Sequence, residues 1–322
     1  MNAKGSVSVA LASFNGQTYI SEQIQSILAQ SAPVTQIVIA DDGSSDATLD
    51  TARAALGAFD GEVVLLPPGQ EPLGVTRNFQ RALAACTGEF IALADQDDLW
   101  HPDKIERMRV ALGDGLLAFS DARLVDASGA PVPERTTLFQ GLGMSEWELE
   151  RLHSGDTWPV FLRRNLVTGA TALLRRSLLS LAGEFPNGWV HDEWLAIVAA
   201  AHGGVRLCDA PTIDYRQHGS NQIGMRSRLT WQIRFARLRA PRSERNARLL
   251  ARAAALAQWA ATHAPELHDD AAAKLAHEQV RSAYPARRLA RIGPIVRERA
   301  TGRYEQFGLG SSDVVRDLVQ PV

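Results

Sequence analysis

The sequence predicts an α/β protein with a mostly parallel sheet flanked by helices, followed by a helical C-terminal extension. Through the first 125 residues, short apolar runs alternate with stretches of helical periodicity. Several of these runs stop in clusters of polar residues, as strands do at the ligand-binding edge of an open α/β sheet. After residue 225 the sequence becomes rich in Ala and Arg. We therefore expect one domain over 1–225 and a basic helical region over 226–322.

The elements of the first part follow from hydrophobic periodicity. A helix after the first strand is indicated by Ile20, Ile24 and Ile27, which recur with the spacing of one helical face. Pro67 and Pro68 stop the third strand, and Ser45 or Asp46 is expected to cap the second helix. The predicted strands are 7–12, 36–40, 62–66, 90–94 and 116–119, with further helices over 74–85 and from Pro102 onward.

The remainder is less regular until its last third. Residues 127–165 contain scattered Gly and Pro, with one short helix over 146–152. A strand and then a helix are expected from Leu166 onward. Further on, the pattern predicts a helix over 192–202, a strand over 205–207 and a long helix over 244–263.

Composition places the 322-residue chain among ordinary soluble proteins. It is 45% hydrophobic and 22% charged, and no apolar stretch approaches the ~20 residues needed to span a bilayer. The first residues resemble a strand and not a signal peptide. Its two cysteines, Cys86 and Cys208, are too few for a disulfide framework, so a cytoplasmic location is expected.

Charge is distributed unevenly along the chain. Residues 1–225 carry 16 Lys and Arg against 27 Asp and Glu, whereas 226–322 carry 18 against 9. A basic region of this kind favours an anionic partner. On the predicted helix 244–263, Arg245, Arg248 and Arg252 fall within about 60° of one another. We expect these arginines to face outward toward an anionic membrane, or the helix to join a bundle or a dimer. Arginines and aromatics also interleave over 231–238, but the acidic first part argues against a nucleic acid partner.

A cluster of carboxylates ends the apolar run over 90–94. Asp95, Asp97 and Asp98 follow directly, and like charges so close repel one another unless a cation compensates them. Mg²⁺ takes oxygen ligands at roughly 2.0–2.1 Å and is commonly held by one or two carboxylates together with substrate phosphates. The alternative is that the aspartates complement the dipole of the following helix, which accounts for one or two of them. The cluster therefore predicts a site for a metal and a diphosphate.

The other strand ends bring further polar groups to the same edge. Ser13, Phe14 and Asn15 follow the first strand, and Asp41 and Asp42 follow the second. An aromatic ring and a carboxylate that can accept from a base N–H suit a nucleotide. Neither G-x-G-x-x-G nor G-x-x-x-x-G-K-[ST] occurs, so a dinucleotide fold and a P-loop are both disfavoured. A strand-to-helix turn, or core packing of the aromatic ring, is the structural alternative at these positions.

Five segments in order resemble the inverting family 2 glycosyltransferases with the GT-A fold. They are Leu11-Ala12-Ser13-Phe14-Asn15-Gly16, Ala40-Asp41-Asp42-Gly43-Ser44-Ser45-Asp46, Arg77-Asn78, Asp95-Gln96-Asp97-Asp98 and Tyr215-Arg216-Gln217-His218-Gly219-Ser220-Asn221. The last of these, together with His191-Asp192-Glu193-Trp194, resembles the rhamnosyltransferase-like branch. The resemblance covers about 6–225 and implies a nucleotide-sugar half over about 1–125 and an acceptor side over about 126–225.

The resemblance assigns roles to matching positions of the donor site. Phe14 would lie against the base, Asp42, with Asp41, would accept from it, and Arg77 would help to hold it. Asp95 would contact the ribose. Asp97 would bind a Mg²⁺ or Mn²⁺ ion at the diphosphate, with His218 as a second contact. Gly169 would allow close approach of the donor sugar. Ala12 stands where some members carry a threonine that contacts the base.

Asp192 is our candidate general base. In transfer with inversion an acceptor hydroxyl attacks the anomeric carbon, and a positioned carboxylate takes its proton. Capping of the helix that begins near Asp192 is the structural alternative. Glu193 ranks second, because a neighbouring helical residue points elsewhere. Secondary candidates for acceptor contacts are Asp98, Trp189, Trp194 and Arg216, with core packing as the alternative for the tryptophans.

The predicted function is metal-dependent transfer of a sugar, with rhamnose as the first choice, from a dTDP- or UDP-sugar to a glycan or lipid-linked glycan. Such an enzyme would serve polysaccharide or lipopolysaccharide synthesis, and its basic region would contact the inner face of the cell membrane. Two alternatives stay open: a phosphatase with an aspartate nucleophile, and a relative that binds glycans without turnover. The phosphatase would normally carry its Asp-x-Asp pair on the first strand, whereas here the pair follows the fourth.

Overall fold

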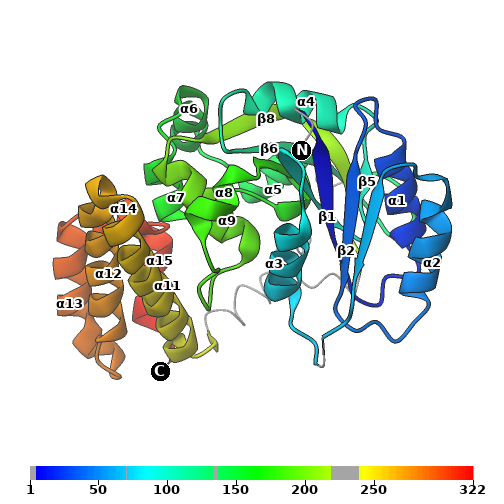
Figure 1. Ribbon diagram of the computed structural model, residues 1–322. Coiled ribbons are helices and arrows are strands. Elements are labelled where there is room, and N and C mark those ends of the chain that lie inside the picture. Colours follow the sequence, from blue (N-terminus) through cyan, green and yellow to red (C-terminus); the bar gives the residue numbers. More distant parts are fainter. Residues whose placement is uncertain (1–4, 70, 133–136, 219–238, 322) are drawn as a thin grey trace. The chain divides into compact units, whose positions relative to one another are not determined.

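The computed structural model describes residues 5–69, 71–132, 137–218 and 239–321 (Figure 1). The chain forms two compact units. The first contains 1–156, 166–185 and 190–225, and the second contains 157–165, 186–189 and 226–322. Two short segments from the expected catalytic part thus belong to the helical unit. The predicted aromatic and arginine segment 231–238 lies outside the described residues, as do Gly219, Ser220 and Asn221.

An eight-stranded sheet forms the centre of the first unit. Strands β1, β2, β3 and β4 are parallel neighbours, and β6 pairs in parallel with β8. The other pairings are antiparallel: β7 with β4 and β6, and β5 with β8. The strands lie in the order β3-β2-β1-β4-β7-β6-β8-β5, with bounds β1 Val7–Ser13, β2 Gln36–Asp41, β3 Glu62–Leu66, β4 Phe90–Asp95, β5 Leu99–Trp100, β6 Leu117–Val125, β7 Ala172–Arg175 and β8 Val205–Arg216.

Helices cover both faces of this sheet. Ile20, Ile24 and Ile27 of α1 pack with the side chains of Val7 and Leu11 that point to one face. Helix α3 packs against β1 and β2 on the other side (Figure 1). The helices are α1 Ile20–Leu28, α2 Thr48–Ala55, α3 Val75–Ala85, α4 Lys104–Leu112, α5 Leu138–Leu142, α6 Glu146–Ser154, α8 Ser177–Ala182 and α9 His191–Ala201, with 3-10 turns η1 Leu56–Ala58 and η2 Gly169–Thr171.

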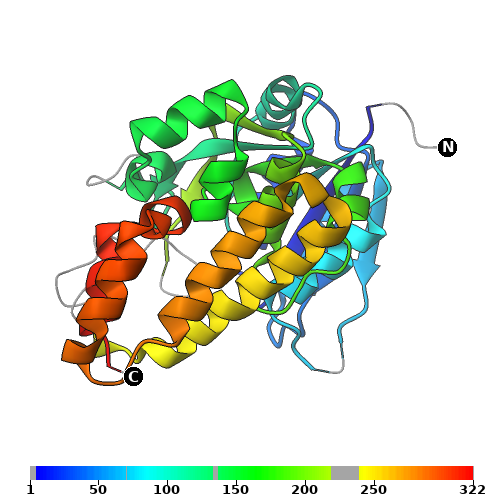
Figure 2. The same cartoon turned by 90° about the vertical axis from the view of Figure 1, so that its left-hand side faces the viewer.

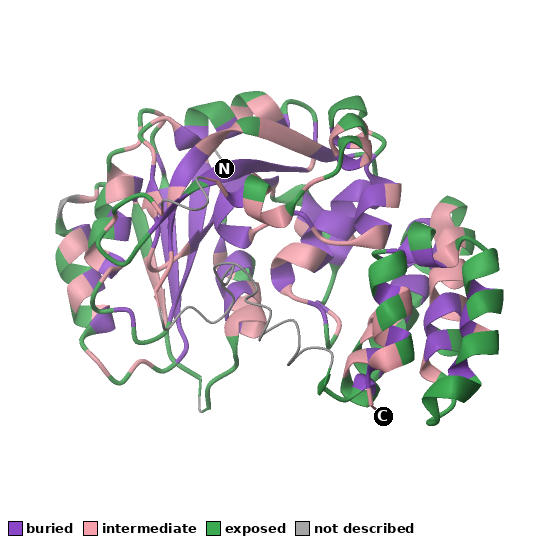
Figure 3. Cartoon of the chain, turned by 180° about the vertical axis from the view of Figure 1, so that it is seen from behind, coloured by how far each residue is buried: buried purple, intermediate pink, exposed green. Residues whose placement is uncertain are grey.

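Burial on both faces explains why the first strands are nearly continuous apolar runs. Every residue of β1 and β2 is buried, and Figure 3 shows buried residues concentrated in the strands. Such runs predict strands well, and the expected bounds agree with β1, β2 and β4 to within one residue. The α/β fold with a mostly parallel sheet is confirmed.

The prediction was incomplete near the end of the sheet. The strand expected over 205–207 extends to Arg216, because pairing with β6 continues through a register shift near Asp121. The two-residue strand β5 was not predicted. Helix α2 begins at Thr48, and Asp46 accepts the backbone N–H of Thr48 at 3.0 Å although Ala47 occupies the capping position.

The second unit is helical. Its two longest helices, α11 and α12, lie side by side (Figure 2). Ala253, Leu256 and Ala260 of α11 are buried, so the apolar face predicted for this helix is used in packing. The elements are α7 Trp158–Arg163, α11 Arg242–His263, η3 Pro265–Leu267, α12 His268–Ser282, α13 Arg288–Ala300, α14 Arg303–Phe307 and α15 Ser311–Val319.

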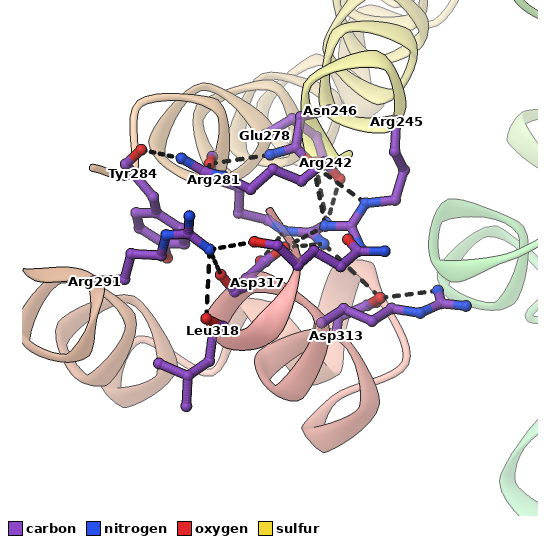
Figure 4. A network of polar contacts seen from close by, with 12 residues as sticks. Arg242, Arg245, Asn246, Glu278, Arg281, Tyr284, Arg291, Asp313, Asp317 and Leu318 are labelled. Carbon is purple, nitrogen blue, oxygen red and sulfur yellow. Dashed lines mark hydrogen bonds and ion pairs between the residues drawn. The ribbon is translucent and has the colours of Figure 1, made fainter. Parts of the chain in front are cut away.

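A buried network of charged groups joins the helices of this unit (Figure 4). The Arg281 guanidinium is 2% exposed and binds the carboxylates of Glu278 on its own helix and Asp317 on α15. Tyr304 donates its hydroxyl to Asp317 at 2.8 Å. Arg281 and Asp317 are desolvated together, so each depends on the other for compensation of its charge.

The outward orientation predicted for three arginines of α11 is wrong for two of them. Arg245 pairs with Asp317 of the buried network, and Arg252 lies over the ring of Trp189 with 4.3 Å between the guanidinium carbon and the ring centroid. Arg248 is exposed. Helical periodicity predicted that the three arginines share one side of the helix. It did not predict whether that side packs against a neighbouring helix.

Candidate functional site

A cavity of about 330 Å³ opens at the carboxyl ends of the parallel strands. Ser13 pairs in register with Asp41, and Ala12 with Asp95, so the ends of β1, β2 and β4 meet at one edge as the sequence predicted. Helix α3, the segment at turn η2, the start of helix α9 and strand β8 supply the rest of the lining. The cavity is lined by residues 12–15, Asp42, Val75, Asn78, residues 95–97, Thr168, Gly169, residues 190–192 and Tyr215.

The acidic cluster lies at and beneath the floor of this cavity. Burial, together with the nearby charges of Asp97 and Asp192, raises the pKa of Asp95 to about 7. Burial also raises the pKa of Asp98 well above its usual range, and its Oδ2 has no hydrogen-bond partner among the described residues. The sequence placed these carboxylates together. Tertiary packing buries them, and this burial makes the charged form of each carboxylate unfavourable.

Lys104 of α4 supplies a positive charge beneath the cluster. Its side chain is fully buried, and Nζ donates to the Ala170 carbonyl at 2.5 Å. Burial lowers the pKa of Lys104 to about 7, while the carboxylates of Asp98 and Asp95 act in the opposite direction. No sequence signal distinguished this lysine from an ordinary helix-surface lysine.

His218 lies against Asp97. Nε2 of the imidazole is 2.8 Å from Oδ2 of the carboxylate, although 121 residues separate them in the chain. The ring of Tyr19 stacks on His218 at 4.9 Å between centroids and holds its orientation. Burial raises the pKa of Asp97, and the hydrogen bond from His218 opposes this.

The carboxylate oxygen is a ligand that suits Mg²⁺ and Mn²⁺, and the imidazole nitrogen beside it can bind a transition-metal ion such as Mn²⁺. Among the described residues, no three His, Cys, Asp or Glu side chains are grouped as a protein-only metal cage. A cation held by Asp97 and His218 would therefore complete its shell with substrate or water oxygens, as Mg²⁺ commonly does.

Asp192 faces the same cavity from the first turn of α9. Its Oδ2 accepts the Gly169 backbone N–H at 3.0 Å, and its Oδ1 accepts that of Glu193 at 2.7 Å. Burial, with a further contribution from the nearby Glu193 charge, raises the pKa of Asp192 to about 7. A carboxyl group with a pKa near neutrality is suited to accept and release a proton.

His191 precedes the candidate base in the chain, and the sequence did not predict it as a site residue. Its ring stacks on Phe79 at 4.0 Å between centroids, and neither ring nitrogen has a hydrogen-bond partner among the described residues. Burial lowers its pKa to about 3, so the imidazole is neutral. A Cβ on Gly169 would lie 2.8 Å from Nε2 of His191, which explains the glycine at this position.

The loop after β1 presents Phe14 to the cavity. Phe14 as a whole is 37% exposed, while its backbone N–H and carbonyl pair with the Gln96 side-chain amide at 2.8 and 3.0 Å. Asn15 adopts a positive φ of 51°, which is uncommon for a residue other than glycine, and its Oδ1 accepts the Ser45 backbone N–H. The loop is thus held from both sides, with the Phe14 ring free to contact a ligand.

The two aspartates after β2 do different things. Asp41 is buried, and its carboxylate accepts from the Ser13 hydroxyl and from Ser44, so it shapes the turn between strand and helix. Asp42 lines the cavity, and its carboxylate accepts the backbone N–H groups of Leu73 and Gly74 at 2.7 and 2.8 Å. Sequence spacing did not distinguish these roles.

Comparison with known proteins shows the family to which this sequence belongs. The sequence model of Glycosyl transferase family 2 matches residues 8–180, which is more than half of the chain. The chain belongs to glycosyl transferase family 2. Among similar proteins, the dTDP-rhamnosyl transferase RfbG of Shigella flexneri is 24% identical, with 71% of this chain and 78% of that protein aligned. The putative glycosyltransferase EpsH of Bacillus subtilis is 35% identical over 67% of this chain and 62% of its own length.

Several relatives are longer than the aligned region. The uncharacterized glycosyltransferase alr2836 of Nostoc is 30% identical, and the alignment spans 66% of its length, just under two thirds. Among solved structures, S. aureus TarS 1-349 in complex with UDP-GlcNAc has a TM-score of 0.59 and 13% identity, covering 97% of this chain and 89% of that one. At this identity the likeness shows the fold, which is GT-A.

The remaining predicted residues of this family 2 chain lie away from the cavity lining. The Arg77 guanidinium donates to the Gln80 side chain at 2.7 Å. Arg216 is 3% exposed and donates to the Asp97 carbonyl and, at 2.7 Å, to the Glu22 carboxylate, which fixes the end of β8. It thereby supports the strand end that leads to His218.

Neither tryptophan lines the cavity. Trp194 is 1% exposed, and its indole donates to the Ala182 carbonyl inside the first unit. Trp189 is 6% exposed and belongs to the second unit, where its indole donates to the Arg252 carbonyl. Both rings are packed against protein, so we do not propose them as acceptor contacts. Glu193 follows Asp192 on α9 but is not part of the lining.

Proposed function

We propose that this protein transfers a sugar, with inversion, from a nucleoside diphosphate sugar to a hydroxyl of a glycan acceptor. One observation carries the proposal. One cavity at the strand ends is lined both by Asp97, whose carboxylate lies 2.8 Å from His218, and by the candidate base Asp192. Membership of family 2 supports glycosyl transfer and argues against the alternative of a phosphatase with an aspartate nucleophile.

The nucleotide would bind at the ends of β1 and β2. The exposed Phe14 ring offers a surface on which a base can stack. Asp42 already accepts two backbone N–H groups, but a carboxylate has about four acceptor sites, so a further N–H from a pyrimidine fits. Arg77 would join this contact by leaving Gln80, and Asp95 would accept from the ribose. Asp41 would act indirectly, through the turn that it shapes.

The diphosphate would lie over the acidic cluster. A Mg²⁺ or Mn²⁺ ion held by Asp97 and His218 would act as a Lewis acid toward the departing diphosphate. Burial destabilises the charged forms of Asp95 and Asp98, and the nearby Lys104 offsets only part of this effect. A bound cation would stabilise their charged forms, which supports the metal assignment.

Asp192 would carry out the proton transfer. As the acceptor oxygen forms its bond to the anomeric carbon, its proton passes to the Asp192 carboxylate. The bond between the anomeric carbon and the diphosphate oxygen breaks, and its electron pair leaves with the diphosphate. The backbone N–H groups of Gly169 and Glu193 fix the carboxylate for this step. Attack opposite to the leaving group produces the inverted configuration.

Rhamnose carried by dTDP is our first choice of donor. Its support is the dTDP-rhamnosyl transferase RfbG at 24% identity, while TarS, seen with UDP-GlcNAc, supports a UDP-sugar as the second choice. We further propose a lipid-linked acceptor at the cytoplasmic face of a membrane. Both cysteines are free thiols, which fits a reducing compartment. None of the helices in the described ranges is long and apolar enough to cross a bilayer.

The test is a panel of dTDP-rhamnose, UDP-GlcNAc, UDP-glucose and GDP-mannose, each incubated with the protein and Mn²⁺, Mg²⁺ or a chelator. We expect slow, metal-dependent release of the nucleoside diphosphate from one donor, with water as the acceptor. Binding without release from any donor, with glycan acceptors also supplied, would support the non-catalytic relative. Absence of both binding and release would contradict the proposal.

A further inference from the structure

The second unit exposes an apolar stripe along α13. Leu289, Ile292 and Val296 are 83%, 47% and 60% exposed. At about 100° per residue these three positions fall within about 60° of one another on the helix. Arg291, Ile295 and Glu298, on another side of the same helix, are buried. The helix therefore packs through one face and presents large aliphatic side chains on another.

Helix α15 adds to the exposed apolar surface. Its Val315 and Leu318 are 49% and 36% exposed. The Arg291 guanidinium of α13 donates to the backbone carbonyls of Asp317 and Gln320, which ties the end of α15 beside α13 (Figure 4). The two helices also pack directly on each other. Scattered apolar residues on a surface are ordinary, but two neighbouring helices that both expose them need an explanation.

The charge around the stripe has a single sign. Arg288, Arg297 and Arg299 of α13 are exposed. Residues 286–303 contain six Arg and one acid, Glu298, which is buried and lies 2.7 Å from His277. The acidic residues of α15 are buried as well. On both helices the carboxylates are thus buried, and the exposed charged groups are arginines.

We propose that the face formed by α13 and α15 lies on an anionic lipid bilayer. Aliphatic side chains flanked by arginines are the pattern of a helix that lies in the membrane interface. Each Arg near a negatively charged leaflet adds attraction, while the aliphatic side chains enter the headgroup region. The inference names a surface for the proposed membrane association. That surface differs from the α11 arginines, two of which have partners inside the unit.

The combination of arginines and aliphatic side chains favours an anionic bilayer over a second copy of the chain or a nucleic acid. In a two-fold contact between copies, the same surface meets itself, so arginines would face arginines. A nucleic acid would use the arginines but leave the Leu, Ile and Val side chains without a suitable partner, since bases stack on aromatic rings. An anionic bilayer is complementary to both kinds of side chain.

The experiment is sedimentation of the full chain with vesicles of phosphatidylcholine alone or mixed with phosphatidylglycerol, at low and high salt. We compare the wild type with the triple variant Leu289→Gln, Ile292→Gln, Val296→Gln, whose changes are at exposed sites and should leave folding intact. Val110→Gln is the matched control, because Val110 is an 80% exposed valine on α4 of the first unit. A second variant, Arg288→Gln with Arg299→Gln, tests the charges.

We expect the wild type and Val110→Gln to bind mixed vesicles and the triple variant to bind at least about ten-fold more weakly. The arginine variant should lose most of its preference for phosphatidylglycerol. Equal binding by the wild type and the triple variant would overturn the inference. So would a concentration-dependent dimer that the triple variant abolishes without any vesicle binding. Donor breakdown should be unchanged in all variants, so failure here is distinguishable from failure of the proposed function.

Discussion

Replacement of Asp192 by Asn tests the proposed proton acceptor most directly. The side chains have nearly the same shape, and the Asn oxygen can still accept one of the two backbone N–H groups that now bind Asp192. The other N–H would face the amide nitrogen, at a cost of about 1 kcal/mol in the free energy of unfolding. The variant should therefore fold, but it cannot take a proton from the acceptor.

The expected magnitude follows from the environment of the carboxyl group. A lost general base costs about 10²- to 10⁴-fold in rate. With a pKa of about 7, half of the Asp192 groups are deprotonated at pH 7, and the deprotonated form is the active one. The rate should thus fall about five-fold between pH 7 and pH 6 and rise less than about two-fold from pH 7 to pH 8.

The assay is the initial rate of donor breakdown from pH 5.5 to pH 8.5, with the best donor of the panel and saturating Mn²⁺. The pKa of Asp95 is also raised to about 7, so the profile by itself does not assign the base. Asp192→Asn should be slow and nearly independent of pH. The control is Glu193→Gln, which removes the nearby charge that helps raise the Asp192 pKa. That variant should stay active with its profile shifted to lower pH. Wild-type rates in Asp192→Asn would refute the reasoning.

Three further outcomes are expected. His218→Ala should weaken binding of a nucleoside diphosphate about ten-fold or more in the presence of Mn²⁺ and hardly at all with a chelator, as measured by calorimetry; equal effects in both would exclude His218 as a metal ligand. Gly169→Ala should reduce the rate of donor breakdown at least about ten-fold, because its Cβ would lie 2.8 Å from His191 Nε2, whereas Gly57→Ala, with open space at Cβ, should behave as wild type. Arg281→Met should lower the free energy of unfolding by about 3–5 kcal/mol in denaturant titrations, since it removes a cation shared by the buried carboxylates of Glu278 and Asp317 and leaves Asp317 with Arg245; a loss below about 1 kcal/mol would contradict that account.

Local pattern predicted the first half of the fold well because the parallel strands are buried on both faces. Apolar runs bounded by polar turns correspond closely to β1, β2 and β4. Strand β8 was predicted only in part, since Asp209 and Pro211 interrupt its apolar character. Its extension to Arg216 depends on pairing with β6, which no local pattern encodes.

In the site, too, local sequence predicted some features, whereas others depend on tertiary packing. Strand ends predicted which polar residues meet at one edge, because parallel strands end together. They did not predict that Asp41 is used within the turn while Asp42 lines the cavity. Equally, Trp194 is an aromatic residue beside the candidate base, and only its 1% exposure shows that it is part of the interior.

Residue order alone was enough to establish the α/β fold, the group of carboxylates at a strand end and the contrast between an acidic body and a basic extension. These depend on periodicity and composition, which neighbouring residues determine. Tertiary structure decided which groups are buried, which arginines have partners, and that Asp97 meets a histidine 121 residues away. Burial and long-range contact are properties of packing between distant segments, and they set both the pKa values of the site and the surface left free for a partner.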